Sequence, residues 1–240
     1  MTANQPSLVI FDLDHTLYDF DIAHAAGMSA LRAFAGAQLG ARGSAFEEAF
    51  AEARQNVKAR LGSTASSHSR LLYCHEALEI LGIRSEPVMA LQMEQEYWRN
   101  YLSAAVLRPG VSGMLQTLRY NNVVTAVVTD LTAQIQFRKI VHLDLTREID
   151  HIVCSEETKG EKESLEPFRL LFERVHAGAR EHVWFVGDRD FDAPVQELID
   201  LGLIDSGRGF VLAAQATGHV TGWHDFLELE RMTDSIFGNG

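Results

Sequence analysis

The sequence has 240 residues, of which 46% are hydrophobic and 22% are charged, so its apolar content is sufficient for a sizeable core. This length allows one large domain or a core domain with a smaller one. The formal net charge of −12 opposes contact with a phosphate backbone, so we expect no nucleic-acid partner. A phosphorylated ligand would need a metal ion or locally placed Lys and Arg, because the overall field repels it.

The N-terminal segment and the cysteines bear on the cellular compartment of the protein. The segment of residues 1–7 is short and polar, and neither a signal peptide nor a long apolar span is evident. We therefore predict a cytoplasmic protein with no membrane partner. Cys74 and Cys154 lack paired or metal-type spacing, so we expect buried or incidental thiols.

In the first half of the chain, the spacing of apolar residues changes once, from that of a strand to that of helices. Residues 7–13 contain the apolar run Leu-Val-Ile-Phe and end in acidic residues, which is typical of a buried parallel strand. From residue 22 to about residue 102, apolar residues recur at helical spacing. Breaks at Gly43-Ser44, at Gly62-Ser63 and at residues 82–87 predict about four helices there.

Strands and helices alternate in the second half. The sequence predicts strands at residues 123–129, 149–154, 182–187 and 209–213, and helices at residues 131–142, 165–176 and 191–201. This alternation favours a parallel sheet with helices on both faces. The helical stretch that precedes it is then an insertion after the first strand.

Polar residues gather where the predicted strands end. The four clusters are Asp12/Asp14/Thr16, Thr129/Asp130, residues 155–162, and Gly187/Asp188/Asp192. In open parallel sheets, ligands bind beyond the carboxyl ends of the strands. We therefore expect residues far apart in the sequence to meet in one crevice.

Asp12 and Asp14 are the central candidates. A carboxylate at a strand end can attack phosphorus and form an aspartyl phosphate. Asp14 would point the same way in an extended chain, could protonate the leaving oxygen, and could later activate water. The pair also favours a hard cation such as Mg²⁺. His15 should point the opposite way and serve as a contact residue. Taken alone, the two aspartates equally suit a strand end or a turn.

Thr129 and Lys162 are candidates for binding the phosphoryl group. The Thr129 hydroxyl and nearby backbone N–H groups could hold a phosphoryl oxygen, or Thr129 could cap the helix expected from residue 131. Lys162, in a polar loop before a helix, could neutralise the phosphoryl group and hold the two aspartates in place. Lys159 competes with it for this role.

The last cluster suggests a metal ligand. Asp188 follows a buried strand that ends in Gly187, and its carboxylate suits direct metal binding. Asp192 could support the metal ligands or orient Lys162. It could equally be a helix N-terminal carboxylate that complements the helix dipole, as could Asp190.

Together these residues resemble the haloacid dehalogenase superfamily of hydrolases. Residues 12–17 resemble its first motif, Asp-x-Asp-x-Thr, Thr129 the second, Ser155 to Lys162 the third, and residues 187–192 the fourth. The ordered set spans nearly the whole chain. The resemblance implies an α/β fold in which residues 1–18 and 105–240 form a Rossmann-like parallel-sheet core. It also implies that residues 19–104 form an inserted α-helical cap.

The resemblance further implies a mechanism. Asp12 would be the nucleophile, and Mg²⁺ would be held by Asp12, by the backbone carbonyl of Asp14 and by Asp188. Thr16 and Asp192 would support these ligands. True dehalogenases lack an aspartate at the position of Asp14, which favours the phosphatase branch. The cap and the segment 129–140 are most similar to N-acylneuraminate-9-phosphatases and pyrimidine 5′-nucleotidases.

We therefore expect a magnesium-dependent phosphatase that acts on a small phosphorylated metabolite, a sugar phosphate or a nucleotide. Lys162 would share the phosphate with Thr129 and Asp130. Three residues depart from the family pattern: Glu163 where Pro is usual, Asp130 where Asn is usual, and Arg189 where a small residue is usual. Arg189 could contact substrate or pair with Asp190.

The inserted segment has its own candidates. The segment His68-Ser69-Arg70 and Arg99 could contact substrate, although we favour surface positions for the two arginines. Tyr97, Trp98 and Tyr101 are expected to pack between cap and core.

Three alternatives remain open. One is a phosphomutase of the same fold, in which the aspartate passes its phosphoryl group to a second hydroxyl. Another is a phosphoacceptor receiver module, which the large insertion and the Asp-x-Asp-x-Thr spacing disfavour. The third is a homologue that binds a partner without catalysis. The sequence carries no prediction of oligomeric state.

Overall fold

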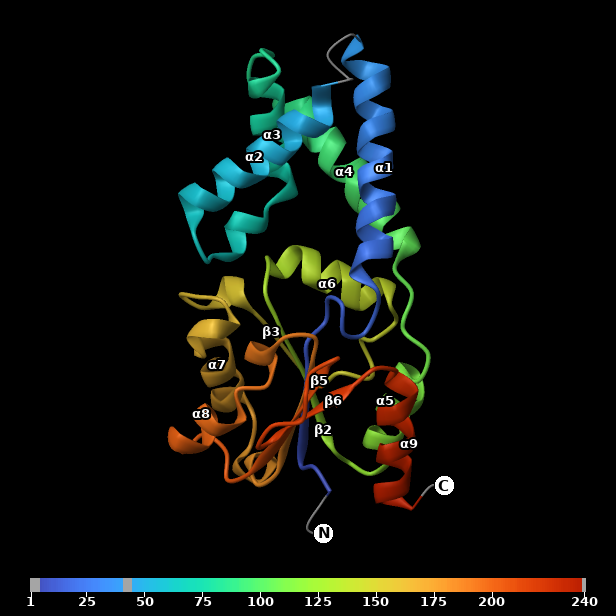
Figure 1. Ribbon diagram of the computed structural model, residues 1–240, viewed down its shortest axis with the longest axis vertical. Coiled ribbons are helices and arrows are strands. Elements are labelled where there is room, and N and C mark those ends of the chain that lie inside the picture. The colour runs from blue at the N-terminus through green and yellow to red at the C-terminus, as the bar shows by residue number, and fades with distance from the viewer. Residues whose placement is uncertain (1–4, 41–44, 239–240) are drawn as a thin grey trace. The chain divides into compact units, whose positions relative to one another are not determined.

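The computed structural model describes residues 5–40 and 45–238, and the chain divides into two compact units. The core unit comprises Met1–Asp19 and Val106–Gly240, and the helical unit comprises Phe20–Ala105. Figure 1 shows a sheet flanked by helices in the core unit and helices alone in the other. Each unit is described below by itself.

The core unit is built on a six-stranded parallel sheet. Its strands are β1 (Leu8–Phe11), β2 (Val124–Thr129), β3 (His151–Cys154), β4 (Val183–Gly187), β5 (Gly207–Leu212) and β6 (Val220–Trp223). Their order in the sheet is β3-β2-β1-β4-β5-β6, with every neighbouring pair parallel. This confirms the predicted α/β class and the first five strands; β6 was not predicted.

Helices cover both faces of this sheet, as predicted. Figure 1 shows α7 (Glu166–Arg174) and α8 (Val195–Asp200) on one side, and α5 (Val111–Tyr120) and α9 (Phe226–Phe237) on the other. Helix α6 (Ala133–His142) follows β2. Short 3₁₀ helices lie at η3 (Ser155–Glu157), η4 (Lys162–Ser164), η5 (Ala177–Arg180) and η6 (Asp190–Asp192). Alternate strand residues, including Ile10 and Phe185, pack against apolar side chains of α7 and α8.

The register of the sheet brings the carboxyl ends of β1, β2 and β4 side by side. Phe11 of β1 lies opposite Val127 of β2 and Val186 of β4. The next residue, Asp12, donates its backbone N–H to the Val186 carbonyl at 2.8 Å. The strand order runs one way from β1 through β2 and the other way through β4, which is the switch point where open α/β sheets bind ligands.

The helical unit consists of α1 (Phe20–Gln38), α2 (Phe46–Leu61), η2 (Ala65–His68), α3 (Arg70–Ile80) and α4 (Pro87–Ala104). The four helices and the breaks at Gly62-Ser63 and residues 82–87 are confirmed, whereas Gly43-Ser44 lies outside the described residues. Cys74 in this unit and Cys154 in the core are free and buried, as expected. Within the described ranges, no helix is both long and apolar enough to cross a bilayer.

Candidate active site

Asp12 lies at the carboxyl end of β1 and is only 6% exposed. Its Oδ1 accepts a hydrogen bond from Lys162 Nζ at 2.5 Å, and its Oδ2 accepts one from the Thr16 hydroxyl at 2.8 Å. Because each oxygen has its own donor, the carboxylate is held in one orientation. Each oxygen keeps a further lone pair for a ligand or for attack on an electrophile.

Lys162 is brought to Asp12 from 150 residues away. It begins η4, is 4% exposed, and donates to both Asp12 and Asp192. Lys159, its competitor, is exposed. Burial alone would lower the pKa of Lys162, but Asp12 and Asp192 raise it overall. Burial raises the pKa of Asp12 to about 6, although Lys162 works in the opposite direction.

Asp192 contacts Lys162, as one of its predicted roles requires, and also the backbone that follows β4. One oxygen accepts from Lys162, and the other accepts the backbone N–H groups of Asp188 at 3.1 Å and Arg189 at 2.9 Å. The approach is so close that a Cβ on Gly187 would lie 2.2 Å from the Asp192 Cβ. A glycine at the end of β4 therefore allows Asp192 to reach Lys162.

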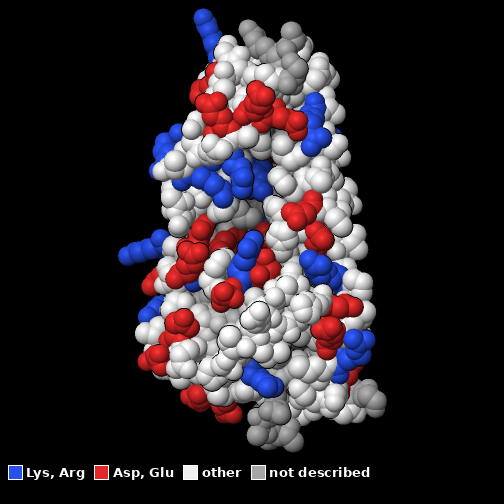
Figure 2. Space-filling model, viewed as in Figure 1, with Lys and Arg blue, Asp and Glu red and all other residues white. Residues whose placement is uncertain are grey.

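Three carboxylates converge beside this lysine. One oxygen each from Asp12, Asp188 and Asp192 lies within 4.8 Å of the others. Figure 2 shows acidic side chains gathered on the core unit. Burial and the charge of Asp12 raise the pKa of Asp188. Carboxylate oxygens grouped in this way suit a hard divalent cation such as Mg²⁺, so the residues present fit a metal site.

Arg189 also contributes to the charge balance of this cluster. Its Nε lies 3.2 Å from an Asp188 oxygen, and the side chain is otherwise exposed. Pairing with Asp190 was one of the two alternatives for Arg189; the guanidinium instead pairs with Asp188. A cation that binds Asp188 would have to share this carboxylate with Arg189 or displace it.

Asp14 is held by residues that the sequence did not suggest. Lys139 Nζ on α6 lies 2.7 Å from both oxygens of Asp14, and the Tyr18 hydroxyl donates to one of them. Gln136 Nε2 also donates, at 3.4 Å. Burial alone would raise the pKa of Asp14, but pairing with Lys139 lowers it. Lys162 was expected to hold both aspartates of the first motif; instead Asp14 has its own lysine.

The second-motif residues are tied to the same helix. Thr129 is buried, and its hydroxyl accepts from Gln136 Nε2 at 2.7 Å. Helix α6 begins at Ala133 with Thr132 at its N-cap, so the alternative role of Thr129 as the cap is wrong. Asp130 accepts the backbone N–H of Lys162 at 3.0 Å and so fastens the third-motif loop.

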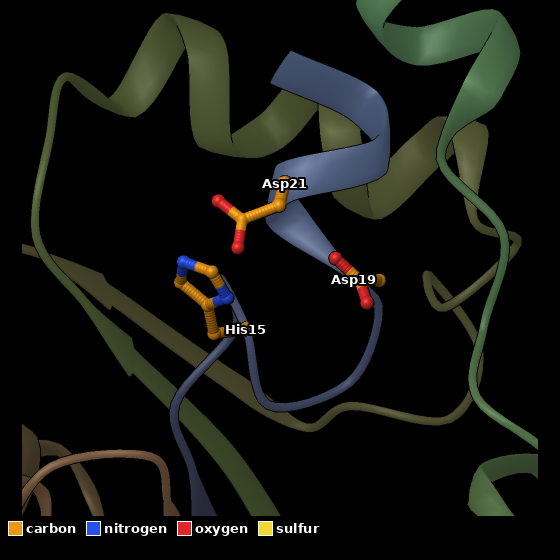
Figure 3. Close-up of side chains that lie close together, drawn as sticks. All are labelled: His15, Asp19 and Asp21. Atoms are coloured by element: carbon orange, nitrogen blue, oxygen red, sulfur yellow. The ribbon is translucent and has the colours of Figure 1, made fainter. Parts of the chain in front are cut away.

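The loop after β1 is shaped by a left-handed residue. His15 has φ 66°, and its carbonyl accepts from Arg108 Nη2 at 2.9 Å. Leu17 donates its N–H to Leu13 at 3.1 Å, which closes the turn. Figure 3 shows His15 and Asp19 on this loop; Asp21, also drawn there, lies in the first turn of α1 and belongs to the helical unit.

Gln136 and Lys139 had a signal in the sequence that was not used. The buried stripe of α6 is Ile135, Gln136, Lys139 and Ile140, so two polar residues stand in an apolar helix face. A buried Lys needs a partner. Their place on the helix that directly follows the Thr129 strand would have directed both towards the site.

Comparisons with known proteins agree with this geometry. The profile of the haloacid dehalogenase-like hydrolase family matches residues 6–195. A ribulose-1,5-bisphosphate 5-phosphatase from Halopiger xanaduensis is 36% identical over 197 residues, which cover 81% of each chain.

Solved structures share the fold. A 2-haloacid dehalogenase from Pseudomonas syringae has a TM-score of 0.69 and 20% identity, over 97% of this chain and all of that one. The hydrolase YfnB from Bacillus subtilis has a TM-score of 0.62 and 18% identity, over 96% of this chain and all of that one. With the match over residues 6–195 and the 36% identical relative, the protein belongs to the haloacid dehalogenase-like hydrolase family.

Proposed function

We propose that this protein is a magnesium-dependent phosphatase that hydrolyses a small phosphate monoester through a phosphoryl group carried by Asp12. The observation that carries the proposal is the buried Asp12 carboxylate, held by Lys162 and Thr16, with the separately held Asp14 two residues away. The Halopiger relative, whose name is that of a sugar-bisphosphate phosphatase, supports a sugar phosphate as substrate.

In the first half of the reaction, an Asp12 oxygen attacks phosphorus and the bond from phosphorus to the leaving oxygen breaks. Asp14 gives its proton to that leaving oxygen. In the second half, Asp14 takes a proton from water as the water attacks phosphorus. The bond between phosphorus and Asp12 then breaks, which frees phosphate and restores both aspartates.

The surrounding residues bind charge and position these groups. Lys162 offsets the negative charge of the phosphoryl group, and the Thr129 hydroxyl binds one of its oxygens. Mg²⁺ held by Asp12, Asp188 and the Asp14 carbonyl would offset the repulsion between the nucleophile and the phosphate. Because Lys139 lowers the pKa of Asp14, the protonated carboxyl is a stronger acid towards the leaving oxygen, but a smaller fraction of Asp14 carries the proton and its carboxylate is a weaker base towards water.

Metal removal tests the proposal directly. We expect the rate of phosphate release from p-nitrophenyl phosphate to fall at least about 100-fold in excess EDTA and to return with added Mg²⁺. The reason is that a bound cation stabilises the charge of the transition state by several kcal/mol. A panel of sugar monophosphates, nucleotides and ribulose 1,5-bisphosphate, followed by released phosphate, identifies the substrate class.

Other outcomes of the same panel would replace the proposal. Conversion of one sugar phosphate isomer into another without phosphate release would indicate a phosphomutase. A long-lived phosphoprotein would indicate a phosphoacceptor. Intact protein that turns over nothing on the panel would indicate a binding homologue.

Lys139 is expected to position Asp14. Replacing it by Met removes the cation that contacts both Asp14 oxygens, so kcat should fall about 10- to 100-fold through misplacement of the acid/base group. The measurement is steady-state hydrolysis of p-nitrophenyl phosphate with saturating Mg²⁺.

Arg138→Met is the matched control, since Arg138 is the exposed neighbour on the same helix. It should leave kcat within twofold. Equal rates for Lys139→Met and Arg138→Met would show that the Lys139–Asp14 pair is not needed for turnover.

A further inference from the structure

Gln136 is a fully buried polar residue on α6, and its side chain connects several parts of the candidate site within the core unit. Its Nε2 lies 2.7 Å from the Thr129 hydroxyl, 2.6 Å from the Asp130 carbonyl and 3.4 Å from an Asp14 oxygen. Its Oε1, by contrast, has no hydrogen-bond donor among the described residues. The amide therefore makes its hydrogen bonds through Nε2 alone.

The Asp130 carbonyl determines which way the Gln136 amide is turned. A carbonyl oxygen accepts hydrogen bonds and cannot donate them, so the group that faces it at 2.6 Å has to be an N–H. Turning the amide by half a turn would place Oε1 there, and two acceptor oxygens would then repel each other. Nε2 carries two hydrogens, and its two short contacts are those to the Asp130 carbonyl and to Thr129 Oγ1.

This orientation fixes the role of the Thr129 hydroxyl. A hydroxyl has one proton to donate and lone pairs that accept. Because Nε2 can only donate, Thr129 Oγ1 accepts from it and keeps its own proton for another partner. The Asp130 carbonyl lies 3.4 Å from Oγ1, which is longer than the roughly 2.5–3.0 Å of an ordinary O–H···O bond. The Thr129 proton therefore stays available for an acceptor beyond the carboxyl end of β2.

The same amide also occupies the competing acceptor. The Asp130 carbonyl receives its hydrogen bond from Nε2. Without the amide, this carbonyl would lack that donor, and a buried acceptor without a donor is unfavourable. It would then attract the Thr129 proton, because Oγ1 is the hydroxyl beside it. Removal of Gln136 is thus expected to turn the Thr129 hydroxyl away from a ligand.

We propose that Gln136 is a positioning residue, which directs the Thr129 proton towards a phosphoryl oxygen by donating to both Thr129 Oγ1 and the Asp130 carbonyl. The inference rests on the proposed function, because it takes a phosphoryl group as the ligand of Thr129. Two buried polar residues of α6 then have separate tasks: Gln136 orients the group that binds phosphate, and Lys139 holds the acid/base group.

A double-mutant cycle with Thr129 tests the inference. Gln136→Met and Thr129→Val should each lower kcat/KM for p-nitrophenyl phosphate about 10- to 100-fold in saturating Mg²⁺, because each removes the same hydrogen bond to the phosphoryl group. The double variant should lose no more than about twofold beyond the slower single variant. Losses that multiply in the double variant would overturn the inference, because Gln136 would then act independently of Thr129.

Gln134→Met is the matched control, since Gln134 is an exposed glutamine on the same helix. It should leave kcat/KM within twofold, and a loss equal to that of Gln136→Met would overturn the inference. If Gln136→Met does not fold, as judged by circular dichroism, Gln136→Glu replaces it in the cycle. The Glu carboxylate has nearly the same shape but accepts the Thr129 proton instead of donating to the hydroxyl, so the same loss is expected.

Calorimetric titration with inorganic phosphate in saturating Mg²⁺ separates this inference from the proposed function. The Kd for phosphate should rise about tenfold in Gln136→Met and in Thr129→Val, and no further in the double variant. This pattern in a protein that hydrolyses no ester would support the role of Gln136 and refute the phosphatase.

Two other results would overturn the role of Gln136 while the phosphatase stands. One is wild-type kcat/KM together with wild-type phosphate affinity in Gln136→Met. The other is a fall in kcat with phosphate affinity unchanged, which would show that Gln136 acts on Asp14 and not on the hydroxyl of Thr129.

Discussion

Asp12→Asn should hydrolyse p-nitrophenyl phosphate at least about 10⁴-fold more slowly than the wild-type protein in saturating Mg²⁺. An amide cannot attack phosphorus as a carboxylate does, so the covalent route is lost. Asn has nearly the same shape and can still accept the Thr16 hydrogen bond. The measurement is kcat, together with acid-quenched labelling of the protein by a phosphate ester, which should mark the wild type only.

Asp190→Asn is the control for this variant. Asp190 is an exposed aspartate close to the same cluster in sequence, and its substitution should leave kcat within twofold. Wild-type activity in Asp12→Asn would reject Asp12 as nucleophile. Loss of activity in both variants would point to a general effect of charge instead.

Lys162→Met should damage both catalysis and stability. The residue offsets the buried Asp12 and Asp192 carboxylates, so its loss leaves them uncompensated. Breaking a buried ion pair from one side costs about 3–5 kcal/mol, which we expect in the free energy of unfolding by urea. Turnover should fall about 10³-fold, because the transferring phosphoryl group loses its cation.

Lys159→Met provides the comparison. Lys159 lies three residues earlier and is exposed, so its loss should change stability by less than about 0.5 kcal/mol and leave turnover intact. Added Mg²⁺ should restore part of the stability of Lys162→Met, because a bound cation offsets the same carboxylates. Equal unfolding curves for the two variants would contradict the ion-pair geometry.

The sequence was informative where local pattern and topology agree. Short apolar runs that end in acidic residues predicted β1 and β4, and the parallel sheet then required Asp12 and Asp188 to meet at one edge. Loop order alone did not distinguish Lys162 from Lys159; the family resemblance favoured Lys162, and the structure places its Nζ 2.5 Å from Asp12. Spacing along the chain shows which residues approach the edge but not which of them pair.

Elements that depend on tertiary packing were harder to predict. Strand β6, Val-Thr-Gly-Trp, has only four residues and is only partly buried. So short a segment shows no clear alternation of apolar and polar residues from which a strand could be predicted. Helix α5 does carry an apolar stripe of Val111, Met114, Leu115 and Leu118, which was overlooked beside the stronger strand signals. Arg70 of α3 is only 9% exposed, so its expected surface position is wrong. Its burial had no local sign at all, because the aromatic rings around it come mainly from another helix.

The pairing between Tyr18 and Leu107 bears on how the chain tolerates its long insertion. The two residues form an antiparallel bridge, and Arg108 donates its N–H to the Leu17 carbonyl at 2.8 Å. The outgoing and returning segments are thus clamped side by side within the core. Doubling the length of a flexible loop between such fixed ends costs only about 0.6 kcal/mol in closure entropy. Insertions of very different length and content can therefore be accommodated at this point while the sheet keeps its connectivity.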